Sequence, residues 1–286
     1  MKVLEVRRPA VAGSFYPSSR KELLELLQHL FNSLGLNGIP SPRTEGERRI
    51  EALISPHAGY VYSGRTAAAG YSVLAEDGLP ETFVILGPNH TGLGAAFSVS
   101  NAKYWETPLG SVEVDRELAL AIQKHFDELA FDDLAHMSEH SIEVQLPFLQ
   151  AIYGGGFRIV PIAMGVQTPE ESVALGEAIS IASEELHRDI VVIASSDMSH
   201  YLPEEEARRR DMAALEAITS MDVQRLFRTL FKLDVSMCGP GPASVAITHA
   251  RLRGVTRGEL VRYSTSAETS GDKSFVVGYA SVVFRR

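Results

Sequence analysis

The sequence contains one cysteine, Cys238, among 286 residues. An intramolecular disulfide is therefore excluded, and so little cysteine is typical of a protein from a reducing compartment. No apolar run approaches the ~20 residues that a membrane-spanning helix needs, and the first residues do not resemble a signal peptide. We therefore expect a cytoplasmic protein without a membrane partner.

Positive charge is also scarce. The chain has 27 lysines and arginines against 36 aspartates and glutamates, which gives a formal net charge of −9. A nucleic-acid partner would require a basic surface, so we expect none. The glycines do not form a GxGxxG or GxxxxGK[ST] pattern that opens a helix after a strand, so we expect no nucleotide cofactor.

Short apolar runs alternate with segments of helical periodicity along the whole chain. The predicted strands span 50–55, 82–86, 157–164 and 189–195, and two further apolar runs span 260–264 and 275–284. The predicted helices span about 20–34, 64–75, 115–126, 139–150 with a kink at Pro147, 168–187, 203–219, 222–233 and 239–253. This alternation predicts an α/β fold with a largely parallel central sheet. The length fits one domain over residues 1–286.

Three of the predicted strands run directly into polar segments that contain histidine. Strand 50–55 is followed by His57, strand 82–86 by His90, and strand 189–195 by Asp197 and His200. The carboxyl ends of parallel strands meet at one edge of a sheet, where open α/β sheets bind their ligands. We therefore expect these side chains to line a single crevice.

Some of His57, His90, Asp197, His200 and Cys238 could together bind a metal ion. Two imidazoles and a thiolate are suitable ligands for iron, copper or zinc, and three protein ligands leave a coordination position open for catalysis. Cys238 precedes a predicted helix, whose N-terminus would favour a thiolate. Two alternatives stay open: Cys238 as a small buried apolar residue, or as a nucleophile paired with His200.

The remaining acids and histidines allow a structural and a functional interpretation. Asp197 could orient His200 as a general acid or base, or the pair could be an Asx turn beside a surface histidine. His136 and His140 could reach into the crevice or could simply precede a capped helix. We assign the histidines on predicted helices to structural roles: His29, His125, His187 and His249.

Seven motifs occur in an order that resembles the Memo family. They are Pro9 to Pro17 (PAVAGSFYP), Pro56 to Gly64 (PHAGYVYSG), Leu86 to His90 (LGPNH), Thr107 to Gly110 (TPLG), Glu139 to Phe148 (EHSIEVQLPF), Ser196 to Tyr201 (SDMSHY) and Cys238-Gly239. The resemblance extends from about residue 8 to the C-terminus. In eukaryotes the family mediates cell motility, and in prokaryotes it belongs to the AmmeMemoRadiSam system, which implies a radical SAM protein as a partner.

The resemblance implies a fold similar to class III extradiol dioxygenases, a single-domain α/β/α sandwich with a crevice at the strand ends. It implies that His57 and His90 are metal ligands and that Cys238 takes the place of the carboxylate ligand of the dioxygenases. It places Asp197 and His200 in the same pocket, with His200 as the acid/base. The substrate pocket would then include Phe15, Tyr60 and His140.

These observations lead to three hypotheses about function. The first is a metal-binding protein that uses iron(II) or copper(I), with zinc as a further candidate, for redox or dioxygenase-like chemistry on an unknown small molecule or peptide. The second is a non-catalytic module that binds a peptide or protein in an enzyme-like crevice. The third is a zinc- or cysteine-dependent hydrolase.

Overall fold

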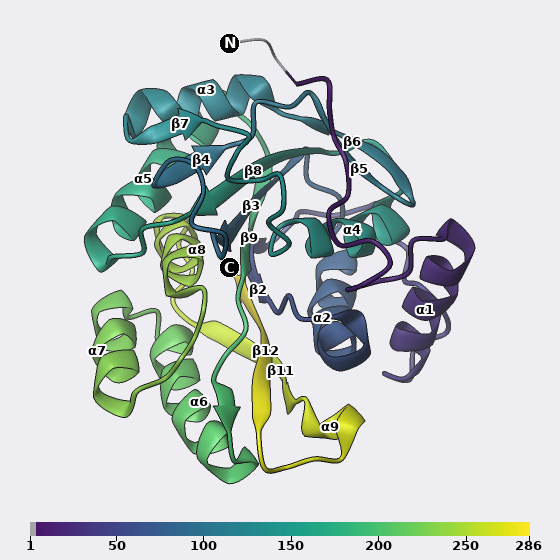
Figure 1. The fold of residues 1–286 in the computed structure, drawn as a ribbon. Helices are drawn as coiled ribbons and strands as arrows, with labels where there is room; N and C mark the ends of the chain where they lie inside the picture. Colours follow the sequence, from purple (N-terminus) through teal and green to yellow (C-terminus); the bar gives the residue numbers. More distant parts are fainter. Residues whose placement is uncertain (1–3) are drawn as a thin grey trace.

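A mixed sheet with a parallel centre crosses the whole molecule in this computed structural model, which describes residues 4–286 (Figure 1). Neighbouring strands follow the order β1 (Val6–Arg7), β5 (Tyr104–Thr107), β6 (Gly110–Val114), β8 (Arg158–Met164), β3 (Thr82–Pro88), β9 (Ile190–Ser195), β2 (Ile50–Ser55), β12 (Val276–Arg285) and β10 (His200–Leu202). From β6 to β2 every neighbouring pair is parallel, whereas β12 is antiparallel to β2. β11 (Gly258–Thr265) pairs with β12, and β4 (Phe97–Val99) pairs with β7 (Leu129–Phe131) and β8.

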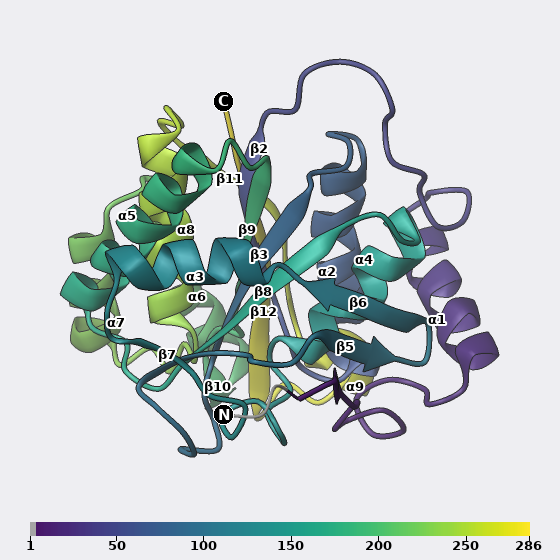
Figure 2. The same ribbon diagram turned by 90° about the horizontal axis from the view of Figure 1, so that it is seen from above.

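Two layers of helices cover the sheet, one on each face (Figure 2). The first layer contains α3 (Arg116–His125), α5 (Pro169–Glu185), α6 (Glu204–Thr219), α7 (Val223–Leu233) and α8 (Pro240–Leu252). The second contains α1 (Arg20–Asn32), α2 (Tyr60–Ala75), α4 (Leu146–Tyr153) and α9 (Ala267–Ser270).

The central strands are buried on both faces, as expected for parallel strands between two helical layers. Successive residues of a strand point to opposite faces, so that on β2 Ile54 packs into the core of the first layer and Leu53 into that of the second. The predicted single α/β domain with a mostly parallel sheet is confirmed, and the antiparallel strands at its margins make the sheet mixed.

Local signals located several element boundaries well. Strand 50–55 coincides with β2, and the predicted cap of the first helix is present, since Ser19 Oγ accepts a hydrogen bond from Glu22 N–H. Thr168 caps α5 in the same way, with Pro169 at its first position. A cap depends on only four consecutive residues, and a short stretch of sequence therefore suffices to predict it.

Other predictions were wrong. The predicted helix 139–150 with a kink at Pro147 is instead a loop, a short 3₁₀ turn at Glu143–Gln145 and then α4. Pro147 lies in the first turn of α4, where its missing N–H has no helical acceptor to lose, and it begins the helix without kinking it. The short strands β4 to β7 were not predicted. His187, predicted to lie on a helix, instead follows the end of α5, with φ +50°.

Among residues 4–286, no helix is long and apolar enough to cross a membrane.

Candidate metal centre

Three imidazoles lie together at the carboxyl edge of the sheet. Each of His57, His90 and His140 offers a ring nitrogen, and the three nitrogens lie within 4.8 Å of one another. His57 follows β2 and His90 follows β3, and both strands run parallel to β9. The expected convergence of these two strand-end histidines is therefore observed, and His140 joins them from the loop that precedes α4.

One carboxylate, that of Glu139, contacts both His90 and His140. Its Oε1 lies 3.0 Å from Nδ1 of His90 and 3.4 Å from Nδ1 of His140, and its Oε2 accepts the backbone N–H of His90 at 2.6 Å. Burial opposes ionisation of Glu139, but hydrogen bonds from His90 and from the Ser141 N–H outweigh it and hold the pKa well below its usual range. Because Glu139 engages Nδ1, each ring keeps its Nε2 for another ligand, a common arrangement around bound metals.

His57 is buried and held at its other ring nitrogen by a hydroxyl. Its Nδ1 lies 2.9 Å from Ser195 Oγ, and its backbone N–H donates to Oδ1 of Asp197 at 2.9 Å. Burial lowers the pKa of His57 far below its usual value, with the nearby His140 and His90 adding to the effect, and burial also lowers the pKa of His140. Both imidazoles are therefore neutral at neutral pH, the form that binds metals.

Cys238 lies against His57, with Sγ 3.3 Å from Nε2 of the ring. The residue precedes α8, and its sulfur accepts a hydrogen bond from the Asp197 backbone N–H at 3.1 Å. Burial of the thiol and the nearby Asp197 carboxyl raise the pKa of Cys238 well above its usual value. Desolvation of the charge therefore opposes the thiolate that the helix N-terminus is expected to favour.

Asp197 and His200 are close in sequence, but each is hydrogen-bonded to a different group. The Asp197 carboxyl accepts from the backbone of His57, and burial raises its pKa to about 6. Nδ1 of His200 lies 2.9 Å from the carbonyl oxygen of Ser236, and the His200 N–H donates to the Ser236 hydroxyl at 2.8 Å. Asp197 therefore fixes the backbone of His57 through a hydrogen bond, while Ser236 orients the ring of His200.

The two aromatic residues expected in the pocket occupy different positions. The Phe15 ring lies 4.6 Å from the His140 ring and forms a wall of the cluster. Tyr60 is buried in the core, where its hydroxyl donates to the carbonyl of Val144 and its ring packs 4.8 Å from that of Phe148. Tyr60 is therefore a core residue that packs beneath the site.

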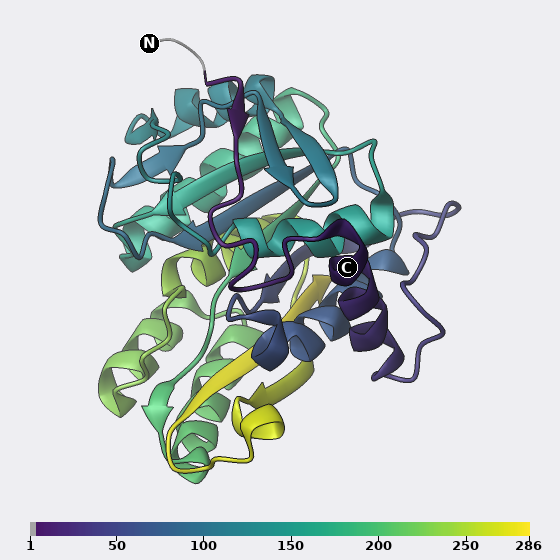
Figure 3. The same ribbon diagram turned by 45° about the vertical axis from the view of Figure 1, so that its right-hand side comes forward.

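An N-terminal strap, residues 6–17, carries Phe15 to this position. Figure 3 shows the strap passing from β1 across α4 to α1. The buried carboxylate of Glu143 holds it through an ion pair with Arg7, the N–H groups of Ala10 and Val11 at 2.8 and 3.1 Å, and the Tyr16 hydroxyl at 2.5 Å. The strap is therefore fixed at several points, and the position of Phe15 depends on Glu143.

The remaining histidines considered from the sequence lie outside the cluster. Nε2 of His136 is 3.0 Å from the Ser98 carbonyl, and its ring packs against Trp105. Nδ1 of His249 is 2.8 Å from Ser180 Oγ.

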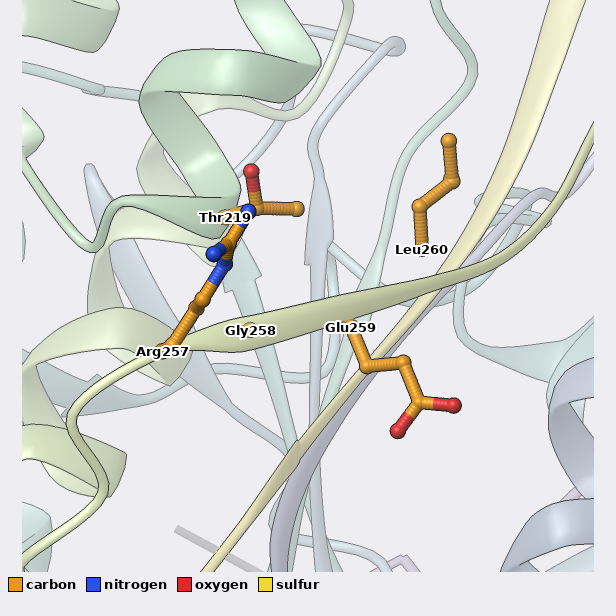
Figure 4. Close-up of a pocket in the computed structure, with 5 residues that line it drawn as sticks. All are labelled: Thr219, Arg257, Gly258, Glu259 and Leu260. Atoms are coloured by element: carbon orange, nitrogen blue, oxygen red, sulfur yellow. The ribbon is translucent and has the colours of Figure 1, made fainter.

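A surface hollow of about 490 Å³ lies apart from the histidine cluster (Figure 4). It contains no histidine and is lined by Thr219, Arg257, Gly258, Glu259 and Leu260.

The residues that orient the imidazoles were not predicted from the sequence, which assigned no role to Glu139, Ser195 or Gln145. The position of Glu139 next to His140 was the one available signal, since carboxylates often hold histidine ligands. Ser195 and Gln145 gave no signal, because Ser195 reaches His57 from 138 positions away and Gln145 reaches Ser195 from 50 positions away.

The fold and the cluster define an α/β protein with a candidate metal centre at the carboxyl edge of its sheet. The chain belongs to the Memo family: the family described as "Memo-like protein" matches residues 7–283. It is 47% identical over 281 residues to a MEMO1 family protein of Methanopyrus kandleri, covering 98% of this chain and 99% of that protein. A MEMO1 family protein of Ignicoccus hospitalis is 48% identical over 280 residues, covering 98% of both chains. The resemblance found in the motifs is thereby confirmed.

Proposed function

We propose that this protein binds one iron or copper ion through His57, His90 and Cys238 and uses it for redox chemistry on a small molecule or peptide. The carrying observation is the group of three imidazoles, in which each Nδ1 faces an acceptor and leaves Nε2 for a ligand. The sulfur of Cys238 stands 3.3 Å from Nε2 of His57. Two such ligands of one tetrahedral ion lie roughly 3.5 Å apart, given their usual bond lengths.

The donor set fits a soft or borderline metal. A thiolate with imidazoles favours copper, zinc and iron over magnesium or calcium, which prefer oxygen ligands. His140 stacks on His90, with ring centroids 4.7 Å apart, and its ring centroid lies 4.6 Å from that of Phe15. In the proposed arrangement His140 lines the open side of the site, where the substrate enters.

A bound iron or copper ion would supply electron transfer at this position. Residues of the chain would donate or accept protons and form the walls of the site. Asp197, whose pKa is raised to about 6, can give or take a proton near neutral pH. His200 has Nδ1 occupied by Ser236, which leaves Nε2 available as an acid or base. Phe15 would provide an apolar wall beside His140.

The test is anaerobic purification followed by elemental analysis and metal titration of the wild type, Cys238→Ser and His140→Gln. We expect about one iron or copper per chain, with affinity much lower in Cys238→Ser than in His140→Gln. The reverse order would make His140 the third ligand. Failure of the wild type to bind either metal after anaerobic loading would contradict the proposal.

A second candidate function is binding of a peptide without turnover, and the surface beside His200 favours it. Tyr201 lies within β10, Phe275 directly precedes the paired strand β12, and their side chains are 73% and 69% exposed. Exposed aromatic side chains of this kind often mark binding surfaces. Peptide binding that survives the double variant His57→Ala and His90→Ala would support this function over metal-dependent catalysis.

A further inference from the structure

The hydroxyl of Ser195 lies at the centre of a buried hydrogen-bond network behind His57. Its Oγ is 2.9 Å from Nδ1 of His57, 2.8 Å from Nε2 of Gln145 and 2.6 Å from the carbonyl oxygen of Ser141. Ser195, Gln145 and Ser141 are all fully buried, so water does not compete for these bonds. Each donor and acceptor in the network can therefore be assigned by counting protons.

The orientation of the Gln145 amide follows from two neighbours. Its nitrogen lies 3.0 Å from the carbonyl oxygen of Pro56, which can only accept. Its oxygen lies 2.7 Å from the Tyr71 hydroxyl, which donates to it. A flipped amide would place two oxygens against each other at Pro56. Gln145 therefore presents an N–H donor to Ser195.

The single proton of the Ser195 hydroxyl is then assigned as well. The Ser141 carbonyl can only accept, so the hydroxyl donates to it, and one lone pair of Oγ accepts from Gln145. The hydroxyl has only acceptor capacity left for His57. Nδ1 of His57 must therefore carry the proton, and its Nε2 carries the lone pair that faces Cys238.

We propose that Ser195 and Gln145 are positioning residues that hold His57 in the tautomer protonated at Nδ1, which is the tautomer that a metal bound at Nε2 requires. This inference rests on the proposed metal binding for its purpose, but its hydrogen bonds exist without metal. His90 and His140 use a carboxylate, Glu139, for the same task. A neutral acceptor behind His57 avoids placing a second acid beside that ring, because Asp197 already lies 3.9 Å from its Nε2.

The first test is nitrogen-15 NMR of the imidazoles in the metal-free protein. We expect His57 to show one protonated nitrogen at Nδ1 and one unprotonated nitrogen at Nε2 throughout the neutral pH range. In Ser195→Ala, Nδ1 loses its acceptor, and the two tautomers should exchange. A wild-type His57 protonated at Nε2 would overturn the assignment, and this measurement requires no variant to fold.

The second test is metal affinity. Loss of a group that orients a metal-binding histidine costs about 10–100-fold in affinity, so Ser195→Ala should bind with unchanged stoichiometry and a Kd raised by that factor. Ser195→Thr, which keeps a hydroxyl, should restore most of the affinity. Ser180→Ala is the matched control, because it removes a buried serine from Nδ1 of His249, outside the cluster. It should leave both the His57 resonances and the metal affinity unchanged.

The outcomes separate the two proposals. An unchanged Kd and an unchanged tautomer in folded Ser195→Ala would overturn the positioning role. A wild type that shows the Nδ1-protonated ring but binds no metal would contradict the proposed function and still support the hydrogen-bond assignment.

Discussion

Sγ of Cys238 lies 3.3 Å from Nε2 of His57, although 181 positions separate the two residues in the chain. The contact joins the loop before α8 to the loop after β2, and α8 packs on the first layer's face of β2 and β9. It places a soft sulfur donor next to an imidazole nitrogen at a separation suited to one metal ion.

Metal binding should release about one proton per ion at neutral pH. The raised pKa of Cys238 keeps the thiol protonated, so a metal must displace its proton, whereas the lowered pKa values of His57 and His140 leave these rings neutral beforehand. Affinity should therefore increase as the pH is raised through the neutral range. Calorimetry in buffers of different ionisation enthalpy measures the proton count. A count near zero in the wild type would argue against thiolate ligation.

Glu139→Gln should weaken metal binding by about 10–100-fold, since one carboxylate orients both His90 and His140. Titration of the metal-free protein measures the change. Glu185→Gln is a matched control, because Glu185 pairs with His125 at 3.0 Å on the surface. Equal affinities in the two variants would contradict the role of Glu139.

The same variant should show a distinct pH dependence of stability. The pKa of Glu139 is depressed in the folded protein, so its ionisation stabilises the fold above the unfolded pKa of about 4.5. That contribution is lost as the pH falls through the folded pKa. The stability difference between wild type and Glu139→Gln, measured by urea unfolding, should therefore be largest near neutrality and shrink in acid. A pH-independent difference would show that ionisation of Glu139 contributes nothing.

Tyr16→Phe should destabilise the N-terminal strap. The Tyr16 hydroxyl donates to the buried carboxylate of Glu143, and a hydrogen bond to a charged group contributes about 1.5–3 kcal/mol. Urea unfolding measures the loss. Tyr62→Phe, at an exposed tyrosine, should change stability by less than about 0.5 kcal/mol. A loss as small as this for Tyr16→Phe would mean that the remaining contacts of Glu143 suffice to hold the strap.

Gly87→Ala should disturb the loop that carries His140. A methyl group at Gly87 would lie 2.9 Å from Cβ of Ser141 and closer still to its hydroxyl, so the buried loop would have to shift. Overpacking of this kind costs about 1–3 kcal/mol, and metal affinity should fall with it. Gly155→Ala, where a methyl group meets nothing within 4 Å, is the control for thermal unfolding and metal titration. Equal behaviour of the two variants would contradict the close fit at Gly87.

Features of this protein that depend on neighbouring residues could be predicted from the sequence alone. Alternating apolar strands and periodic helices indicated an α/β fold, the Ser19 cap began α1, and histidines directly after β2 and β3 indicated the edge that carries the cluster. The ordered motifs were enough to indicate the Memo family. These signals are readable because each depends on backbone hydrogen bonding or side-chain periodicity within a few residues.

Which side chains contact one another depends on the tertiary structure. It brought His140 into the cluster, placed Glu139 between two imidazoles, and set the Cys238 sulfur against His57, with Nδ1 of His200 bonded to Ser236. It also directed Tyr60 into the core. Such contacts depend on how helices and loops pack on the sheet, and burial then sets the protonation of His57 and Cys238. No local pattern encodes a pKa, because desolvation is produced by residues far apart in the chain.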